Sequence, residues 1–332
     1  MPKPAEPERA QRELDMWRQE AGARSGAEPE LAQFMADLAA RDEGRVFLAA
    51  IFGNSPFLSQ GLRHDPAILQ KVTEQGFDRT FEEMLTALAD RQLWQHGRAE
   101  VMSGLRLAKR GVALTIAMAD IAGAWPLEKV CRSLSRFAEL SISIALNFLL
   151  LQAGKSGHLA LADPENPASG SGIVVLGMGK LGARELNYSS DIDLLVLFDG
   201  EKVDYCGDDG PQQGLHRMVR EMVSLLSERS ADGYVFRTDM RLRPDPGATP
   251  LAVSTAAAEQ YYESLGQNWE RAAMIKARPV AGDQEVGTLF LNRLVPFVWR
   301  KYLDFAAIED IHSIKRQINA HKGHHEIAVA GH

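Results

Sequence analysis

The sequence predicts a mixed helix-and-strand core that lies between helical segments. Three observations support this fold class: helical periodicity before residue 154, short apolar runs at 173–176 and 192–198, and helical periodicity after residue 283. Apolar residues that recur every three or four positions indicate a buried helix face, whereas short β-branched runs bounded by turns indicate strands. With 332 residues the chain is long enough for two or three domains.

The composition is ordinary for a soluble globular protein, with 45% hydrophobic and 24% charged residues. A net charge of −7 argues weakly against general nucleic-acid binding, which needs a basic surface. Cys131 and Cys206 form no CxxC pattern, so neither a disulfide framework nor a thiolate zinc site is expected. The polar N-terminus has no apolar signal core, and the longest apolar stretches are too short for a membrane helix. We therefore expect a cytoplasmic protein that contacts no membrane.

The first half of the chain is expected to be helical. Residues 1–30 are rich in Glu, Arg, Ala and Pro and should be frayed or partly helical. Residues 31–153 should form several helices, because prolines interrupt the pattern and Pro126 stands where a helix can begin. One buried helix face is expected from Leu127, Val130, Cys131, Leu134, Ala138, Ser141, Ala145 and Phe148.

The second half begins with a Gly/Pro/Ser-rich connector at residues 154–171 and then alternates strands and helices. The expected strands are 173–176, 192–198 and 234–243. The expected helices are 211–230, a stretch that Ser254 caps and that runs through Tyr262, and a further helical region after Asp283, with a turn at 231–233.

The segment Gly177–Gly182, GMGKLG, matches the GxGxxG pattern after a strand. Only a short link joins Gly182 to Asp191, whereas a parallel βαβ crossover needs about a dozen residues. Leu181 also stands where a Walker A loop has Ser or Thr. A packing turn, a dinucleotide site and a phosphate-facing turn of another fold all stay open, and the last is favoured.

Asp191 and Asp193 begin the second apolar run, directly after Ser189 and Ser190. Side chains at i and i+2 of a strand point to the same face, and a carboxylate pair beside buried residues is costly unless it is solvated or binds a cation. The pair next to a glycine turn therefore suggests a magnesium site that faces a phosphate. The structural alternative is a strand-end turn whose side chains bind backbone amides.

The expected third strand, Tyr234–Arg243, alternates apolar residues with charged ones. Its charged face carries Arg237, Asp239, Arg241 and Arg243. A third aspartate can complete a two-metal cluster, and arginines can clamp phosphate oxygens. A solvent-exposed ladder of ion pairs is the alternative.

Two further groups of residues have structural explanations that are favoured. Arg271 and Arg278, near Trp269, are seven residues apart and should share one face of a solvated helix. His321, His324 and His325 are expected to be exposed in a loop, and metal binding by them is the lesser alternative.

Three blocks in this order, GMGKLGARELNYSSDIDLLVLF, TDMRLRP and NWERAAMIKAR, resemble the glutamate–ammonia-ligase adenylyltransferase family. The resemblance runs from about Phe47 and includes IFGNSPFL around Asn54. It implies an α+β fold: a DNA polymerase β-like nucleotidyltransferase core, a mixed sheet with flanking helices, plus helical N-terminal and C-terminal segments. The expected domains are a helical region at 1–125, the nucleotidyltransferase-like catalytic domain at 126–282, and the truncated start of a C-terminal helical region at 283–332.

Family members are longer and carry two nucleotidyltransferase-like halves, and the blocks NSPFL and MRLRPDPGATPLAVS resemble the N-terminal, adenylyl-removing half. The chain therefore looks like a fragment of such an enzyme. The resemblance implies removal of AMP from a tyrosine of glutamine synthetase by inorganic phosphate, with ADP as product, and regulation of the full-length protein by the PII signal protein. The alternatives are ATP-dependent adenylylation of glutamine synthetase, a regulatory binding module without turnover and, last, a dinucleotide-binding oxidoreductase.

The resemblance also assigns expected roles to residues. Asp191, Asp193 and Asp239 would be catalytic and would hold Mg²⁺ or Mn²⁺. Nucleotide or phosphate binding is expected, with the arginines inferred from strand alternation, for Gly177, Gly179, Lys180, Gly182, Ser190, Arg237, Arg241 and Arg243.

Overall fold

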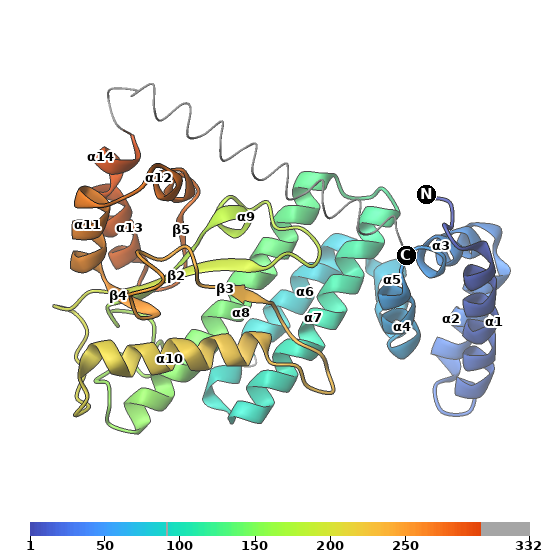
Figure 1. The fold of residues 1–332 in the computed structure, drawn as a ribbon. Coiled ribbons are helices and arrows are strands. Elements are labelled where there is room, and N and C mark those ends of the chain that lie inside the picture. The colour runs from blue at the N-terminus through green and yellow to red at the C-terminus, as the bar shows by residue number, and fades with distance from the viewer. Residues whose placement is uncertain (91, 300–332) are drawn as a thin grey trace. The chain divides into compact units, whose positions relative to one another are not determined.

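The computed structural model describes residues 1–90 and 92–299, which form two compact units (Figure 1). The helical unit comprises residues 1–148, 184–190 and 225–236, and the sheet unit comprises, of the described residues, 149–183, 191–224 and 237–299. These units interleave along the chain and cut across the boundaries predicted near residues 125 and 282. The predicted domain division stays a prediction.

The helical unit confirms the expected series of helices between prolines. Pro56 is the first residue of one helix, and the side chain of Ser55 caps that helix by accepting from Leu58 N at 3.2 Å. The helices are α1 (Pro7–Arg24), α2 (Pro29–Ala40), α3 (Asp42–Phe52), α4 (Pro56–His64), α5 (Ala67–Gln75), α6 (Phe77–Asp90), the 3₁₀ turn η1 (Leu93–Gln95), α7 (Arg98–Ile121) and most of α8 (Leu127–Lys155).

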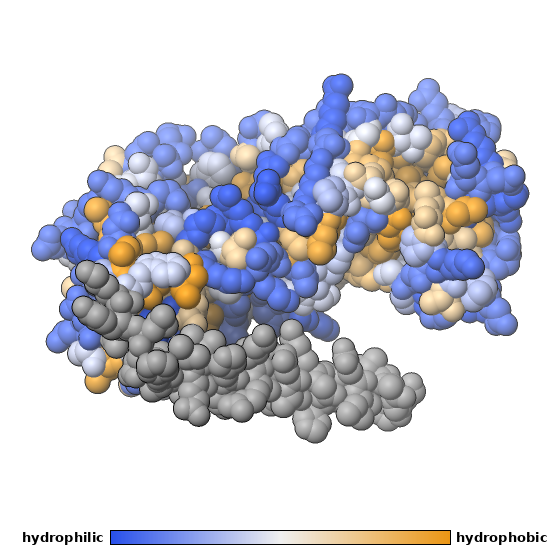
Figure 2. All heavy atoms as spheres, turned by 90° about the horizontal axis from the view of Figure 1, so that it is seen from above, coloured by the Kyte–Doolittle hydropathy of each residue, from blue (hydrophilic) through white to orange (hydrophobic). Residues whose placement is uncertain are grey.

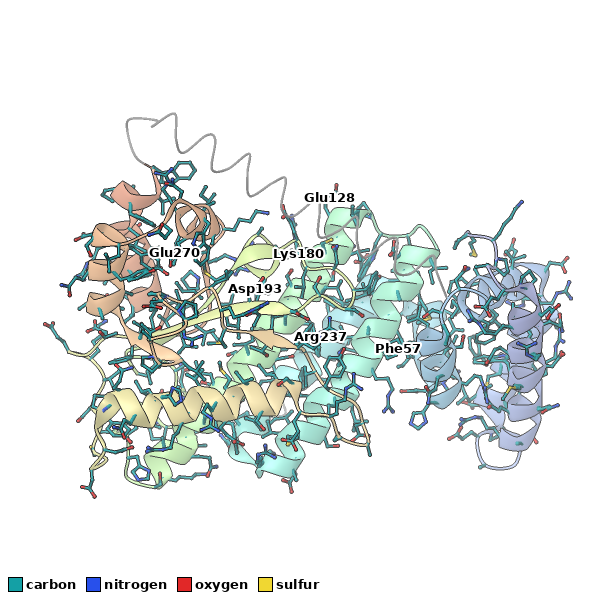
Figure 3. The ribbon with its side chains drawn as sticks, viewed as in Figure 1. Phe57, Glu128, Lys180, Asp193, Arg237 and Glu270 are labelled. Carbon is teal, nitrogen blue, oxygen red and sulfur yellow. The ribbon has the colours of Figure 1, made fainter. Side chains whose placement is uncertain are left out.

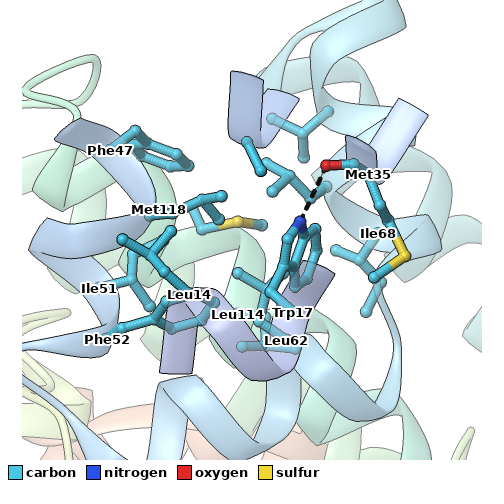
Figure 4. Packing of buried hydrophobic residues seen from close by; sticks show 14 of the residues in the cluster. Leu14, Trp17, Met35, Phe47, Ile51, Phe52, Leu62, Ile68, Leu114 and Met118 are labelled. Atoms are coloured by element: carbon cyan, nitrogen blue, oxygen red, sulfur yellow. Dashed lines mark hydrogen bonds between the residues drawn. The ribbon is translucent and has the colours of Figure 1, made fainter. Parts of the chain in front are cut away.

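The N-terminal residues are more ordered than the sequence predicted. Residues 7–24 form a complete helix whose buried side chains, Ala10, Leu14, Trp17 and Ala21, follow three- and four-residue spacing. The Trp17 indole is fully buried and donates to Met35 O at 3.0 Å (Figure 4). A narrow apolar stripe on an otherwise charged segment therefore suffices once a neighbouring helix covers it.

Helix α8 begins directly after Pro126, as predicted. It is long and apolar enough to cross a membrane by length and composition, and 72% of its most apolar window is buried inside the protein. Burial of this extent is typical of the core helix of a folded domain.

In the sheet unit the described residues form a five-stranded mixed sheet (Figure 1). Strand order is β3-β2-β1-β5, and β4 also pairs with β2. The elements are β1 (Ile173–Gly177), α9 (Gly179–Gly182), β2 (Ile192–Phe198), α10 (Gly210–Ser227, which ends in the helical unit), β3 (Thr238–Asp239), β4 (Ala252–Ser254), α11 (Thr255–Ser264), α12 (Asn268–Met274), β5 (Arg278–Gly282), α13 (Gln284–Arg293) and α14 (Val295–Val298).

Strands β1 and β2 are antiparallel neighbours, with Ile173 opposite Phe198 and Gly177 opposite Leu194. A dinucleotide-binding βαβ unit requires parallel strands, so this pairing excludes that interpretation of the GxGxxG pattern. All residues of β1 are buried, and Asp193 is the one half-buried residue of β2. The two strands match the predicted apolar runs because both of their faces are covered.

The predicted ten-residue strand at 234–243 is wrong in extent. Only Thr238 and Asp239 pair with β2, in parallel, and the chain leaves the sheet until β4 resumes parallel pairing with β2 at Ala252. The side chain of Asp239 accepts from Arg241 N at 2.8 Å, which turns the chain just after β3. Local side-chain bonding therefore overrides the alternating pattern.

The predicted helices of the second half are confirmed by their caps. Ser254 accepts from Ala257 N at the start of α11, and Asp283 accepts from Glu285 N and Val286 N at the start of α13. Residues of these helices, including Tyr262 and Phe290, share one core with Val174 and Leu195 of the central strands. Figure 2 shows a mostly hydrophilic face on which hydrophobic residues gather in separate groups.

Candidate functional site

Asp193 and Asp239 lie on neighbouring strands at the same level of the sheet. They are paired in the parallel register of β2 and β3, although 46 positions of sequence separate them. Neighbouring strands of a sheet lie about 4.8 Å apart, so the two residues are close neighbours. The register therefore brings Asp193 and Asp239 together, and Asp191 also acts on Asp193 through its negative charge. Figure 3 labels Asp193 together with Lys180 and Arg237.

The glycine turn lies against Asp193. Met178 N donates to Asp193 O at 2.8 Å, and Gly179 follows with φ +51°. A Cβ atom at Gly179 would lie 2.6 Å from Asp193 Oδ2. Only glycine suits this position, because its backbone is left-handed and its Cα faces the carboxylate. The close approach agrees with the predicted turn, and its phosphate-binding role stays a prediction.

A neighbouring strand holds the far end of the same turn. Arg278 of β5 donates from Nε to Gly182 O at 3.2 Å and from Nη2 to Leu181 O at 3.3 Å. A Cβ atom at Gly182 would overlap Lys276 O. Gly179 therefore leaves room for the carboxylate of Asp193, and Gly182 leaves room for the backbone of the segment that leads into β5.

The structure corrects the prediction that Arg271 and Arg278 share a helix face. Helix α12 ends at Met274, and Arg278 begins β5. The seven-residue spacing was misleading because the chain changes from helix to strand within it. The Pro279 that follows Arg278 was a signal against a continuing helix.

The outer aspartates are each bound by an arginine. Arg237 Nε donates to Asp191 Oδ1 at 2.5 Å. Arg241 Nε lies 3.0 Å from Asp239 Oδ1 and 2.9 Å from Oδ2, and its Nη2 donates to Oδ2 at 2.5 Å. These hydrogen bonds hold the pKa of the Asp239 carboxyl below its usual range.

Asp193 is electrostatically different from its neighbours. Within the described residues, no side chain or backbone N–H donates a hydrogen bond to its carboxylate. Burial, followed by the negative charges of Asp239 and Asp191, raises the pKa of this carboxyl to about 6, against the opposing charges of Arg241 and Lys180. The site therefore has one carboxylate of weakened acidity between two that carry counterions.

The other predicted site residues lie in varied surroundings. Lys180 is on α9 and acts on Asp193 through its charge. Ser190 precedes Asp191 in a turn in which Ser190 N donates to Asn187 O at 3.2 Å. Gly177 ends β1, where a Cβ atom would crowd Val280 and Leu181. His321, His324 and His325 lie outside the described residues.

Arg243 has a structural environment. Its guanidinium donates to Met240 O at 2.7 Å, Pro246 O at 2.7 Å and Thr249 O at 3.2 Å. These contacts tie together the excursion between β3 and β4. They favour a structural role, and the phosphate contact expected from strand alternation stays a prediction.

Sequence reasoning missed a buried arginine of the helical unit. Arg106 of α7 is 1% exposed and donates to the carbonyls of Met102, Leu225, Glu228 and Gly233. It fixes the end of α10 and the turn that follows, from which the chain continues to Arg237 and Asp239. An arginine among the apolar residues of a helix was the available signal.

The donor set suits a hard divalent cation in chemistry, because it offers carboxylate oxygens on adjacent strands beside the turn at Gly179. In the conformation described, however, no three acidic, histidine or cysteine side chains converge to hold an ion within residues 1–90 and 92–299. In the same conformation guanidinium groups engage the carboxylates of Asp191 and Asp239.

Comparison with known proteins identifies the family of this chain. The family model of glutamate-ammonia ligase adenylyltransferase matches residues 46–293, which is well over half of the chain. The chain belongs to this family. Members include proteins named bifunctional glutamine synthetase adenylyltransferase/adenylyl-removing enzyme from Rhizobium meliloti (strain 1021), 52% identical over 86% of this chain, and from Agrobacterium fabrum, 50% identical over 92%.

The glutamate-ammonia ligase adenylyltransferase relatives are much longer than this chain. The matched region covers 30% of the Rhizobium meliloti protein and 31% of the Agrobacterium fabrum protein. The chain therefore spans about a third of the length of these relatives. The observed mixed sheet with helical flanks agrees with the α+β nucleotidyltransferase-like core that the sequence predicted.

Proposed function

We propose that this chain removes AMP from adenylylated glutamine synthetase by phosphorolysis. The observation that carries the proposal is the register pair Asp193–Asp239 beside the Gly179 turn, in a chain whose relatives are named for both adenylylation and adenylyl removal. In this reaction an oxygen of inorganic phosphate attacks the α-phosphorus of a tyrosyl-AMP group. The bond from phosphorus to the tyrosine oxygen breaks, the products are ADP and tyrosine, and the phenolate takes up a proton.

The residues of the site supply complementary charges for this reaction. Arg237 and Arg241 are exposed guanidinium groups that can bind the oxygens of the attacking phosphate. Lys180 adds positive charge beside Asp193. Mg²⁺ or Mn²⁺ bound by Asp191, Asp193 and Asp239 would neutralise negative charge on the transferring group.

The assay is ADP release from adenylylated glutamine synthetase in phosphate and magnesium. We expect ADP from the wild-type chain and at least about a hundredfold less from Asp193→Ala. Full activity of Asp193→Ala would remove the site assignment. Arg217→Gln, which removes the ion pair between Arg217 of α10 and Asp209 just before that helix, is the matched surface control.

The second candidate is the reverse reaction, ATP-dependent adenylylation, because the relatives' names contain both activities. Incorporation of labelled AMP from ATP into glutamine synthetase distinguishes it. Binding of the synthetase without turnover in either assay would instead indicate a regulatory binding module. From the family resemblance we also infer a cytoplasmic location and regulation of the longer protein by PII.

A further inference from the structure

Two arginines of the site occupy carboxylate oxygens that a cation would need. Arg241 contacts both oxygens of Asp239 through Nε and Nη2, and its backbone N–H also donates to Oδ1. Arg237 contacts Asp191 Oδ1. A carboxylate oxygen has two lone pairs in its plane, so this bidentate arrangement leaves Asp239 little capacity for a metal ligand.

The Arg241 side chain is far more exposed than its partner Asp239, and both side chains of the Arg237–Asp191 pair are exposed. The Arg241 side chain is 83% exposed, whereas that of Asp239 is 16% exposed, and the Arg237 side chain is 53% exposed. Exposed ion pairs are weak, because water solvates the separated charges well. Each arginine can therefore leave its carboxylate by side-chain rotation while the aspartate keeps its place beside β2.

We propose that Arg237 and Arg241 compete with a divalent cation for Asp191 and Asp239, and that the cation displaces both guanidinium groups. This inference rests on the proposed function. After the exchange every charge still has a partner of opposite sign. The cation neutralises the carboxylates, and the displaced arginines remain beside the site as ligands for phosphate oxygens. Metal occupancy and phosphate binding would then be positively coupled, because each favours the same arginine positions.

Divalent-ion affinity tests the exchange directly. Mn²⁺ titrations at low ionic strength, followed by electron paramagnetic resonance and calorimetry, compare the wild type with Arg237→Gln and Arg241→Gln. Removing a competing arginine should lower the Mn²⁺ dissociation constant about two- to fivefold, the range that exposed ion pairs support. Arg217→Gln removes the same charge from another arginine–aspartate pair and should leave the constant unchanged.

A double variant separates the direct contact from a general charge effect. In an Asp191→Asn background, Arg237→Gln should no longer tighten Mn²⁺ binding, because its carboxylate partner is gone. Equal affinity of the wild type and both arginine variants would overturn the exchange, and so would equal tightening by Arg217→Gln.

Failure of the exchange can be distinguished from failure of the proposed phosphorolysis. Absence of Mn²⁺ binding in all variants would overturn the exchange and the cation's part in the proposed reaction, whereas ADP release tests the reaction itself. Arg237→Lys and Arg241→Lys keep the charge but lose the fork, so they should bind Mn²⁺ with intermediate affinity. They serve as second variants if a glutamine variant does not fold.

Discussion

The two segments that supply the paired aspartates are built in opposite ways. Asp193 belongs to β2, which pairs with β1 over five consecutive positions and is buried on both faces. Asp239 belongs to β3, which has two residues and is followed by an excursion held by the side chain of Arg243. A rigid ladder therefore carries one carboxylate, and a side-chain network carries the other.

This difference shows why the apolar runs were reliable guides and the alternating pattern was not. A strand that is buried on both faces must pair its backbone groups with neighbouring strands, because no water reaches them. In the segment Arg237–Arg243, charged side chains offer the backbone local alternatives, as Asp239 does to Arg241 N. The substitutions below test whether the ladder and the network depend on the contacts described.

The largest effect is expected from Gly182→Ala, in the turn between β1 and β2. The new Cβ atom would overlap Lys276 O, so the turn or the start of β5 must move. We expect about 3–4 kcal/mol of lost stability in urea unfolding, together with loss of ADP release. Gly200→Ala is the matched control, because a Cβ atom there meets nothing within 4 Å. A near-neutral Gly182→Ala would show that this contact is not tight.

Arg106→Met tests the side-chain contacts that hold the segment leading into β3. The substitution removes the hydrogen bonds that the buried guanidinium donates to four carbonyls, and we expect about 2–3 kcal/mol of lost stability. Arg110→Met, one turn along α7 and 3.8 Å from Asp232, should change stability by less than about 0.5 kcal/mol. Equal effects of the two variants would contradict the proposed anchoring by Arg106.

Arg243→Gln separates a structural role from phosphate binding. The loss of three carbonyl contacts should lower the free energy of unfolding by about 1–2 kcal/mol and loosen the excursion. A raised KM for phosphate with unchanged stability would instead support direct phosphate binding. Arg271→Gln is a suitable control, since its guanidinium makes no hydrogen bond within the described part of the chain.

The smallest effect concerns the charge of Asp193. Its folded-state pKa of about 6 is above the ordinary value for aspartate, so the folded form binds the proton more tightly than the unfolded form. The contribution of Asp193 to the free energy of unfolding is fully present below about pH 4, and it is lost as the pH rises through about 6. Asp193→Asn should therefore be about 1 kcal/mol more stable than wild type at pH 7.5 and equal to it near pH 4, in parallel thermal melts. Equal stability at both pH values would contradict this prediction.

Much of the fold followed from local patterns. The bounds of β2, the start of α8 after Pro126 and the caps at Ser254 and Asp283 were predictable, because each depends on residues within a few positions. The helix at Pro7–Arg24 was underestimated because its stripe is narrow. The contacts of Arg278 and Arg106 join residues that are distant in sequence, and no local pattern specifies such partners.

The sequence by itself determined that this chain has two buried strands joined by a glycine turn, with aspartates where the second strand begins. Hydrophobic periodicity and turn chemistry are local, so they can be recognised without the fold. Only the tertiary structure decided that β1 and β2 are antiparallel, that Asp239 lies opposite Asp193, and that arginines engage the outer carboxylates. These features depend on which strands meet, and strand pairing is fixed by burial of the whole sheet.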